Sequence, residues 1–173
     1  RFRNMEPYAE NDGAMGITKF IGEQLNGSLD WNYLADIRDE WDGKLILKGI
    51  LHGQDAARAV AMGIDGLVIS NHGGRQLDAA PQPLAQLAGI RAAVGNNVPL
   101  IVDSGIQSGL DVIRALAMGA DFVMLGRAFM YAVAALGKKG GDHAADILLE
   151  EVRDVMAQLG LQTIADVKSL NLS

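Results

Sequence analysis

A histidine and an arginine stand three residues apart in the string Ser-Asn-His-Gly-Gly-Arg-Gln-Leu-Asp, residues 70–78, directly after an apolar run. Histidine accepts a proton near neutral pH, and the planar arginine fork matches a carboxylate. The two glycines between them allow a tight turn and a close approach to a flat ring. A loop histidine that only bonds to a neighbour is the alternative, which the complete string disfavours. We therefore predict His72 as a general base and Arg75 as a carboxylate anchor.

Three other apolar runs, at residues 44–47, 99–102 and 122–125, also end in polar or glycine-rich residues. Burying an ammonium group is costly unless an anion meets it, so Lys48 is predicted to stabilise negative charge on a cofactor. A lysine that extends out to solvent is the alternative. Gly105 and the pair Gly126-Arg127 are predicted to bind a phosphate through backbone N–H groups at a helix start. Glycine at such a junction also occurs for steric reasons alone.

The elements that carry these residues alternate between strands and helices. Strands are expected at 45–47, 67–70, 100–102 and 122–125, and helices at about 54–62, 83–94 and 108–118. Residues 55–65 recur as residues 111–121, and each copy reads as an amphipathic helix closed by glycine. No Gly-x-Gly-x-x-Gly follows any strand, which disfavours a Rossmann site. The pattern predicts an α/β fold with a parallel sheet, best read as four of the eight strands of a TIM (β/α)₈ barrel.

The flanking segments and the composition give further expectations about domain organisation, partners and location. Residues 1–29 look like a mobile loop and exit segment, and residues 30–173 like the barrel half with its C-terminal helices. Asp30 could cap a helix that runs to about Asp39, and an apolar stripe over residues 145–159, with Leu149 and Met156, is expected to pack on the barrel. A net charge of −6 argues against nucleic acid as a partner, and the lack of cysteine excludes disulfides and thiolate chemistry. No metal site is predicted. The expected location is the cytoplasm, with peripheral contact at the inner membrane as the alternative.

In order and spacing, the motifs at residues 48–50, 70–78, 103–105 and 125–127 resemble the FMN-dependent 2-hydroxy-acid dehydrogenase and oxidase family. That family includes L-lactate dehydrogenase, glycolate oxidase and mandelate dehydrogenase. The resemblance covers nearly the whole chain from Trp31, and it places the chain in the C-terminal half of the barrel, about strands 5 to 8. It implies FMN as cofactor and oxidation of a small (S)-2-hydroxy acid such as L-lactate to the 2-oxo acid.

The resemblance also implies roles for individual residues. His72 would take the substrate proton, Arg75 would pair with the substrate carboxylate, and Lys48 would stabilise the reduced flavin. Ser70 would approach the flavin ring, and the phosphate would be held by Asp103, Ser104, Gly105, Gly126 and Arg127. Gln107 departs from the family, which usually has a phosphate-binding arginine there; it is kept as a cofactor-binding candidate.

The implied partners are an electron acceptor (oxygen, a quinone or a cytochrome), the missing N-terminal half of the barrel, and further copies in a homo-oligomer. Two alternatives stay open. The first is another FMN- or phosphate-binding TIM-barrel enzyme, which would need no base three residues before an arginine. The second is an inactive, truncated half-barrel.

Overall fold

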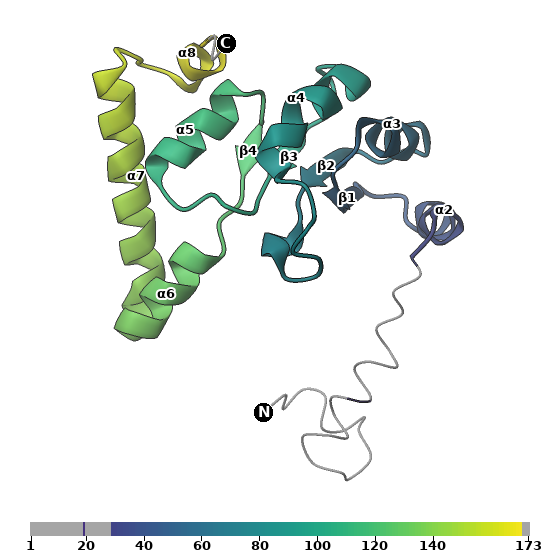
Figure 1. The fold of residues 1–173 in the computed structure, drawn as a ribbon, viewed down its shortest axis with the longest axis horizontal. Helices are drawn as coiled ribbons and strands as arrows, with labels where there is room; N and C mark the ends of the chain where they lie inside the picture. The colour runs from purple at the N-terminus through teal and green to yellow at the C-terminus, as the bar shows by residue number, and fades with distance from the viewer. Residues whose placement is uncertain (1–18, 20–28, 171–173) are drawn as a thin grey trace. The chain divides into compact units, whose positions relative to one another are not determined.

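The computed structural model describes Lys19 and residues 29–170, and the chain divides into two compact units, residues 1–41 and 42–173 (Figure 1). In the first unit the described element is helix α2, Trp31–Glu40. Its start is set by Asp30, whose side chain accepts a hydrogen bond from the backbone N–H of Tyr33 at 2.9 Å. The predicted cap and helix are therefore confirmed. Apart from residue 29, the predicted loop segment 1–29 lies outside the continuously described residues.

The second unit contains a parallel sheet of four strands in the order β1-β2-β3-β4. The strands are β1 (Ile46–Ile50), β2 (Gly66–Ile69), β3 (Leu100–Val102) and β4 (Phe122–Val123). Every residue of β2 is buried, as expected for an inner strand of a sheet with parallel neighbours. The register of β1 on β2 is irregular between Lys48 and Ile50, where Gly49 has a φ of +101°. The predicted strand order is confirmed, with β1 two residues longer and β4 two residues shorter than expected.

Three helices connect these strands: α3 (Gly53–Ala61), α4 (Pro83–Val94) and α5 (Gly109–Ala117). The two copies of the internal repeat, which form α3 and α5, both end as predicted. Gly63 and Gly119 follow them with φ of +86° and +105°, a region that glycine enters without strain. Because each connection is a helix between parallel strands, the carboxyl ends of all four strands meet at one edge of the sheet.

The C-terminal part consists of α6 (Arg127–Leu136), a short 3₁₀ turn η3 (Gly137–Lys139), α7 (Gly140–Gln158) and α8 (Ile164–Lys168). Helix α7 lies along α5 and α6 (Figure 1). A small core of Ile113, Leu116 and Val167 packs against the apolar stripe of α7, which includes Val152, Val155 and Met156.

The predicted stripe on α7 is therefore only partly right. Leu149 and Leu159 were expected to pack on the barrel, but each is 52% exposed; Leu159 follows the last helical residue, Gln158, as the C-cap. Among the described residues, no helix is long and apolar enough to cross a membrane.

Candidate active site

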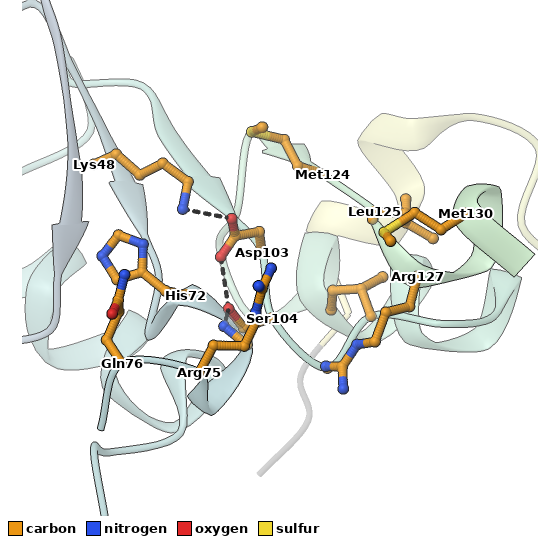
Figure 2. A pocket seen from close by; sticks show the side chains of 14 residues that line it. Lys48, His72, Arg75, Gln76, Asp103, Ser104, Met124, Leu125, Arg127 and Met130 are labelled. Carbon is orange, nitrogen blue, oxygen red and sulfur yellow. Dashed lines mark hydrogen bonds and ion pairs between the residues drawn. The ribbon is translucent and has the colours of Figure 1, made fainter. Parts of the chain in front are cut away.

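An open cleft of about 520 Å³ lies at the carboxyl ends of the four strands (Figure 2). Residues from all four strand ends reach it, as predicted for the active edge of a parallel barrel sheet. Most of the predicted site residues line the cleft: Lys48, His72, Arg75, Asp103, Ser104, Gly105, Gly126 and Arg127. It is also lined by Gly73, Gln76, Ile106, Met124, Leu125 and Met130, which the sequence reading did not assign.

The loop after β2 presents His72 and Arg75 in a defined conformation. Asn71 caps a short 3₁₀ turn, η2 (His72–Gly74), and its side-chain oxygen accepts from the N–H groups of Gly73 and Gly74 at 3.0 and 3.2 Å. His72 itself has a φ of +56°, which is uncommon for a residue with a side chain. Such strain persists only where surrounding contacts hold it. His72 and Arg75 are both exposed, so a small molecule in the cleft can reach their side chains.

Gly49 provides the space in which the His72 imidazole lies, a role that the sequence reading did not give it. A Cβ atom at this glycine would sit 3.1 Å from Nε2 of His72, and the glycine's φ of +101° is disfavoured for other residues. The only local signal was a glycine beside Lys48 at a strand end. A Cβ atom here would require the imidazole to shift by a few tenths of an ångström, in addition to the backbone strain at this φ.

Lys48 meets an anion, but that anion belongs to the protein. Its ammonium lies 3.0 Å from Oδ2 of Asp103 and donates to Oγ of Ser70 at 2.8 Å. Partial burial raises the pKa of the Asp103 carboxyl, but contacts from the hydroxyls of Ser70 and Ser104 and from the Lys48 ammonium outweigh it and hold that pKa below its ordinary value. The carboxylate is thus charged when it faces Lys48.

Ser70 is fully buried and lies beneath the cleft rather than in its lining. Its hydroxyl oxygen also accepts from the backbone N–H of His72 at 3.1 Å. The side chain therefore supports both the lysine and the histidine.

Two helix starts near the cleft differ in how their N–H groups are satisfied. At α5, Ser108 and Asp111 form a capping box, and Oδ2 of Asp111 also accepts from the N–H of Gln107 at 3.1 Å. The Glu151 carboxylate, from α7, accepts from the N–H of Gly109 at 2.6 Å. Two carboxylates thus occupy the start of α5. Since these carboxylates would repel a further anion, the start of α5 is a poor phosphate site.

The start of α6 is different. Gly126 gives it no side-chain cap, and Arg127 is its first residue. Space is open around Gly105 and Gly126, with no atom within 4 Å of a Cβ built on either. A guanidinium, helix N–H groups and open space form a donor set that fits a phosphate. Gln107 is exposed and lies outside the lining of the cleft; its role as a phosphate ligand stays a prediction.

Residues 2–173 match the family described as FMN-dependent dehydrogenase. The L-lactate dehydrogenase of Bartonella tribocorum is 46% identical over 165 residues, 95% of this chain and 43% of the relative. The L-lactate dehydrogenase of Acinetobacter baylyi is 44% identical, with 95% and 43% covered.

Two solved structures are similar to this chain in both fold and sequence. The monotopic membrane protein (S)-mandelate dehydrogenase superposes with a TM-score of 0.82 at 40% identity, covering 91% of this chain and 41% of the neighbour. A mandelate oxidase variant with a monooxide FMN adduct gives a TM-score of 0.78 at 44% identity, covering 82% and 45%.

The chain spans less than half the length of these relatives. Its four parallel strands are accordingly part of the predicted TIM barrel, and FMN is the cofactor. The chain belongs to the FMN-dependent dehydrogenase family.

Proposed function

We propose that the protein containing this chain oxidises a small (S)-2-hydroxy acid such as L-lactate to the 2-oxo acid, with FMN as the cofactor. The observation that carries this proposal is the meeting of His72 and Arg75 in one cleft with the start of α6 and Arg127. A base, a carboxylate anchor and a phosphate-binding helix start are the parts that such a reaction needs. The names of the curated relatives, L-lactate dehydrogenases, support the same substrate class.

His72 is the proposed proton acceptor. Oxidation of the alcohol carbon requires that the hydroxyl proton leave, and the exposed imidazole takes it onto a ring nitrogen. The left-handed backbone at His72 and the space at Gly49 hold the ring in place, so less reorientation is needed when the substrate arrives. FMN, when bound, supplies the two-electron acceptor for the reaction.

Arg75 is the proposed anchor for the substrate carboxylate. It follows His72 after the two glycines of the η2 turn, so the same loop sets the position of both side chains. A bidentate pair fixes the orientation of the carboxylate as well as its distance. In a 2-hydroxy acid the hydroxyl is on the carbon next to the carboxylate. A base and a carboxylate anchor that lie close together can therefore contact both groups at once.

The remaining polar groups are assigned to FMN. Lys48, held by Asp103 and Ser70, would offer its ammonium to the ring, while Arg127, Gly105 and Gly126 would bind the phosphate. Reoxidation by oxygen, a quinone or a cytochrome stays a prediction, as do homo-oligomer formation and a cytoplasmic or peripheral membrane location.

Anaerobic titration tests the proposal. The FMN-loaded protein is mixed with L-lactate, (S)-mandelate, D-lactate or L-lactamide, and the loss of the oxidised flavin absorbance is followed. L-lactate or (S)-mandelate should bleach the flavin. D-lactate has the wrong configuration and L-lactamide lacks the carboxylate, so both should fail. If no 2-hydroxy acid bleaches the flavin, the proposed function is wrong.

Arg75→Lys isolates the anchor in the same assay. The charge stays but the fork is lost, so the affinity for the hydroxy acid should weaken by about 1.5 to 3 kcal/mol, roughly ten- to 150-fold. The discrimination against L-lactamide should shrink in parallel. An unchanged affinity would mean that the carboxylate binds elsewhere.

A further inference from the structure

Four polar side chains at the strand ends and the backbone of His72 and Gly73 form a closed ring of hydrogen bonds, one ion pair and one peptide link, here called the strand-end ring. Lys48 contacts Asp103 at 3.0 Å and Ser70 at 2.8 Å, and Ser70 accepts from the backbone N–H of His72 at 3.1 Å. On the other side, the contacts pass from Asp103 through Ser104 to the N–H of Gly73, which adjoins His72 in the chain (Figure 2). The ring thus connects the ends of β1, β2 and β3.

Ser104 is the member that joins the loop after β3 to the loop after β2. Its hydroxyl donates its proton to Oδ1 of Asp103 at 2.8 Å and accepts from the N–H of Gly73 at 3.0 Å. A serine hydroxyl has one proton, so this one cannot also be donated to a phosphate oxygen. Any contact of Ser104 with a cofactor phosphate would have to come from its backbone. The side chain therefore makes its hydrogen bonds to the loops after β2 and β3.

The backbone at Ser104 supports a role for this particular contact. Its φ is +70°, a left-handed conformation that residues with a Cβ rarely adopt. Among the described residues only His72 shares this property without being glycine. The two strained residues therefore lie in the two loops that the Ser104 hydroxyl connects, and strain of this kind persists where surrounding contacts over-determine it.

The Gly73 N–H has a second acceptor, which makes the contact adjustable. It is shared between Oγ of Ser104 and Oδ1 of Asn71, both at 3.0 Å. Asn71 lies in the same loop as Gly73, whereas Ser104 lies 31 residues after Gly73 in the chain. If the serine hydroxyl is removed, Asn71 still satisfies the N–H, so the turn should form. Only the connection between the two loops is lost.

We propose that Ser104 is a positioning residue that holds the loop of His72 and Arg75 against the end of β3, through the hydrogen bond from Gly73 to its hydroxyl. The ammonium of Lys48 and the backbone of His72, from which the imidazole extends, are thereby held at a fixed separation, because both belong to the strand-end ring. The structural part of this proposal stands on the contacts alone, and its catalytic consequence rests on the proposed function.

Two variants in the protein that contains this chain separate the hydroxyl from the backbone. Ser104→Ala removes the hydroxyl and keeps the strained conformation, whereas Ser104→Gly removes the hydroxyl and relieves the strain. Ser169→Ala is the matched control, since that hydroxyl donates to a carbonyl within α8. Amide hydrogen exchange over residues 72–74 is measured first, because it needs no turnover.

Both Ser104 variants should exchange these amides about three- to tenfold faster than the parent, as expected for the loss of one shared hydrogen bond. The FMN dissociation constant should move by less than about twofold, since the bond lost is internal to the protein. The rate of flavin reduction at saturating hydroxy acid should fall about three- to tenfold. Ser169→Ala should match the parent in all three measurements.

Several results would overturn the proposal. If amide exchange over residues 72–74 is unchanged in Ser104→Ala, the Ser104 hydroxyl does not hold the two loops together. Parent-like behaviour of Ser104→Gly would mean that only the backbone matters. A large loss of FMN affinity without faster exchange would make Ser104 a cofactor ligand. If the parent itself is not reduced by any 2-hydroxy acid, the proposed function fails, while the exchange comparison still decides the role of Ser104.

Discussion

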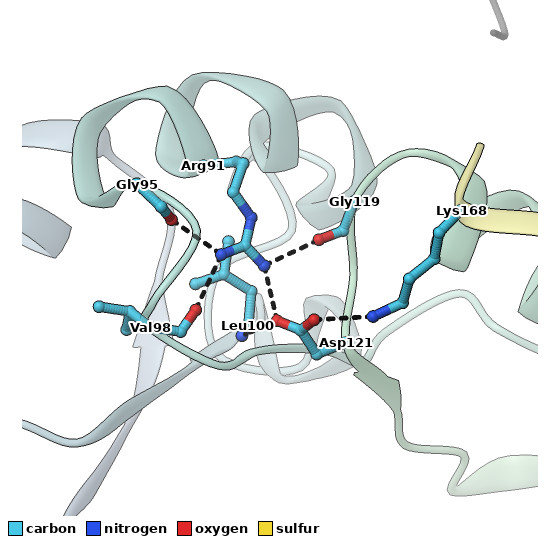
Figure 3. Close-up of polar contacts among 7 residues, drawn as sticks. All are labelled: Arg91, Gly95, Val98, Leu100, Gly119, Asp121 and Lys168. Atoms are coloured by element: carbon cyan, nitrogen blue, oxygen red, sulfur yellow. Dashed lines mark hydrogen bonds and ion pairs between the residues drawn. The ribbon is translucent and has the colours of Figure 1, made fainter. Parts of the chain in front are cut away.

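Replacing Asp121 with asparagine should destabilise the protein in a way that depends on pH. Asp121 lies at the start of β4, where Oδ2 accepts from Arg91 at 2.6 Å and Oδ1 accepts from Lys168 at 2.8 Å (Figure 3). Its carboxylate also accepts from the N–H of Leu100 at 3.0 Å. The same guanidinium of Arg91 donates to the carbonyls of Gly95, Val98 and Gly119. One carboxylate thus joins α4, β3, β4 and α8.

The magnitude follows from the pKa of this carboxyl. Partial burial raises the pKa of Asp121, but hydrogen bonds from Lys168, Leu100 and Arg91 outweigh it and lower the pKa from 3.8 to about 2. A shift of this size corresponds to at most about 2.5 kcal/mol. The side chain is 30% exposed, so solvent screening reduces its contribution to about 1 to 2 kcal/mol.

The direction of the pH dependence follows from the lowered pKa. The folded state binds the Asp121 proton less tightly than the unfolded state, so the stabilisation is complete above the ordinary pKa of 3.8. It is lost as the pH falls through 3.8 toward 2. Asp121→Asn should therefore cost about 1 to 2 kcal/mol at pH 7, and this difference from the parent should shrink at pH 3.

The assay is urea unfolding of the FMN-loaded protein at pH 7, 5 and 3, followed by circular dichroism. Asp146→Asn, at an exposed position on α7, is the control and should change stability little at any pH. An Asp121→Asn difference that is absent at pH 7, or equally large at pH 3, would refute the reasoning.

Three further predictions follow from the geometry. Gly49→Ala should lower the rate of flavin reduction at least tenfold while FMN stays bound, because the new methyl would displace the His72 imidazole; a parent-like rate would contradict this. Gln107→Arg should tighten FMN binding about five- to thirtyfold in a fluorescence titration at fixed ionic strength, if residue 107 faces the phosphate as proposed; an unchanged or weaker dissociation constant would remove it from the site. The isolated 173-residue chain should not behave as a cooperatively folding monomer in sedimentation and thermal unfolding, because β1 and β4 are open edges with Ile46 and Phe122 52% and 64% exposed; a monodisperse 18.4 kDa monomer would contradict this.

Much of the fold could be predicted because its signals are local. The cap at Asp30, the glycines at 63 and 119 and the apolar strand runs all act within a few residues. A helix start at Gly126-Arg127 was predicted, but the extent of α6 was not, because residues 128–136 form a continuous apolar run without helical periodicity. Helix α7 begins at Gly140, earlier than the stripe suggests. A side chain at Gly140 would overlap the carbonyl of Ala132 in α6, a contact that no local pattern reveals.

In the candidate site, too, local features could be predicted from the sequence and long-range contacts could not. His72 and Arg75 could be found because one short string contains both the chemistry and the turn that presents it. Contacts between residues that are distant in sequence could not be found in this way. Ser104 reaches Gly73 over 31 residues, and the carboxylate at the start of α5 comes from Glu151, 42 residues beyond Gly109. Such pairs depend on how the strands and helices pack.

The most direct test of the central proposal is stopped-flow flavin reduction under anaerobic conditions, comparing the parent protein with His72→Ala. With saturating L-lactate or (S)-mandelate, whichever the parent uses, His72→Ala should reduce its flavin roughly 10² to 10⁴ times more slowly, as expected for loss of a general base. FMN should remain bound, because His72 is assigned to the substrate rather than to the cofactor phosphate. Reduction of the His72→Ala flavin at the parent rate would contradict the assignment of the base and, with it, the proposed mechanism.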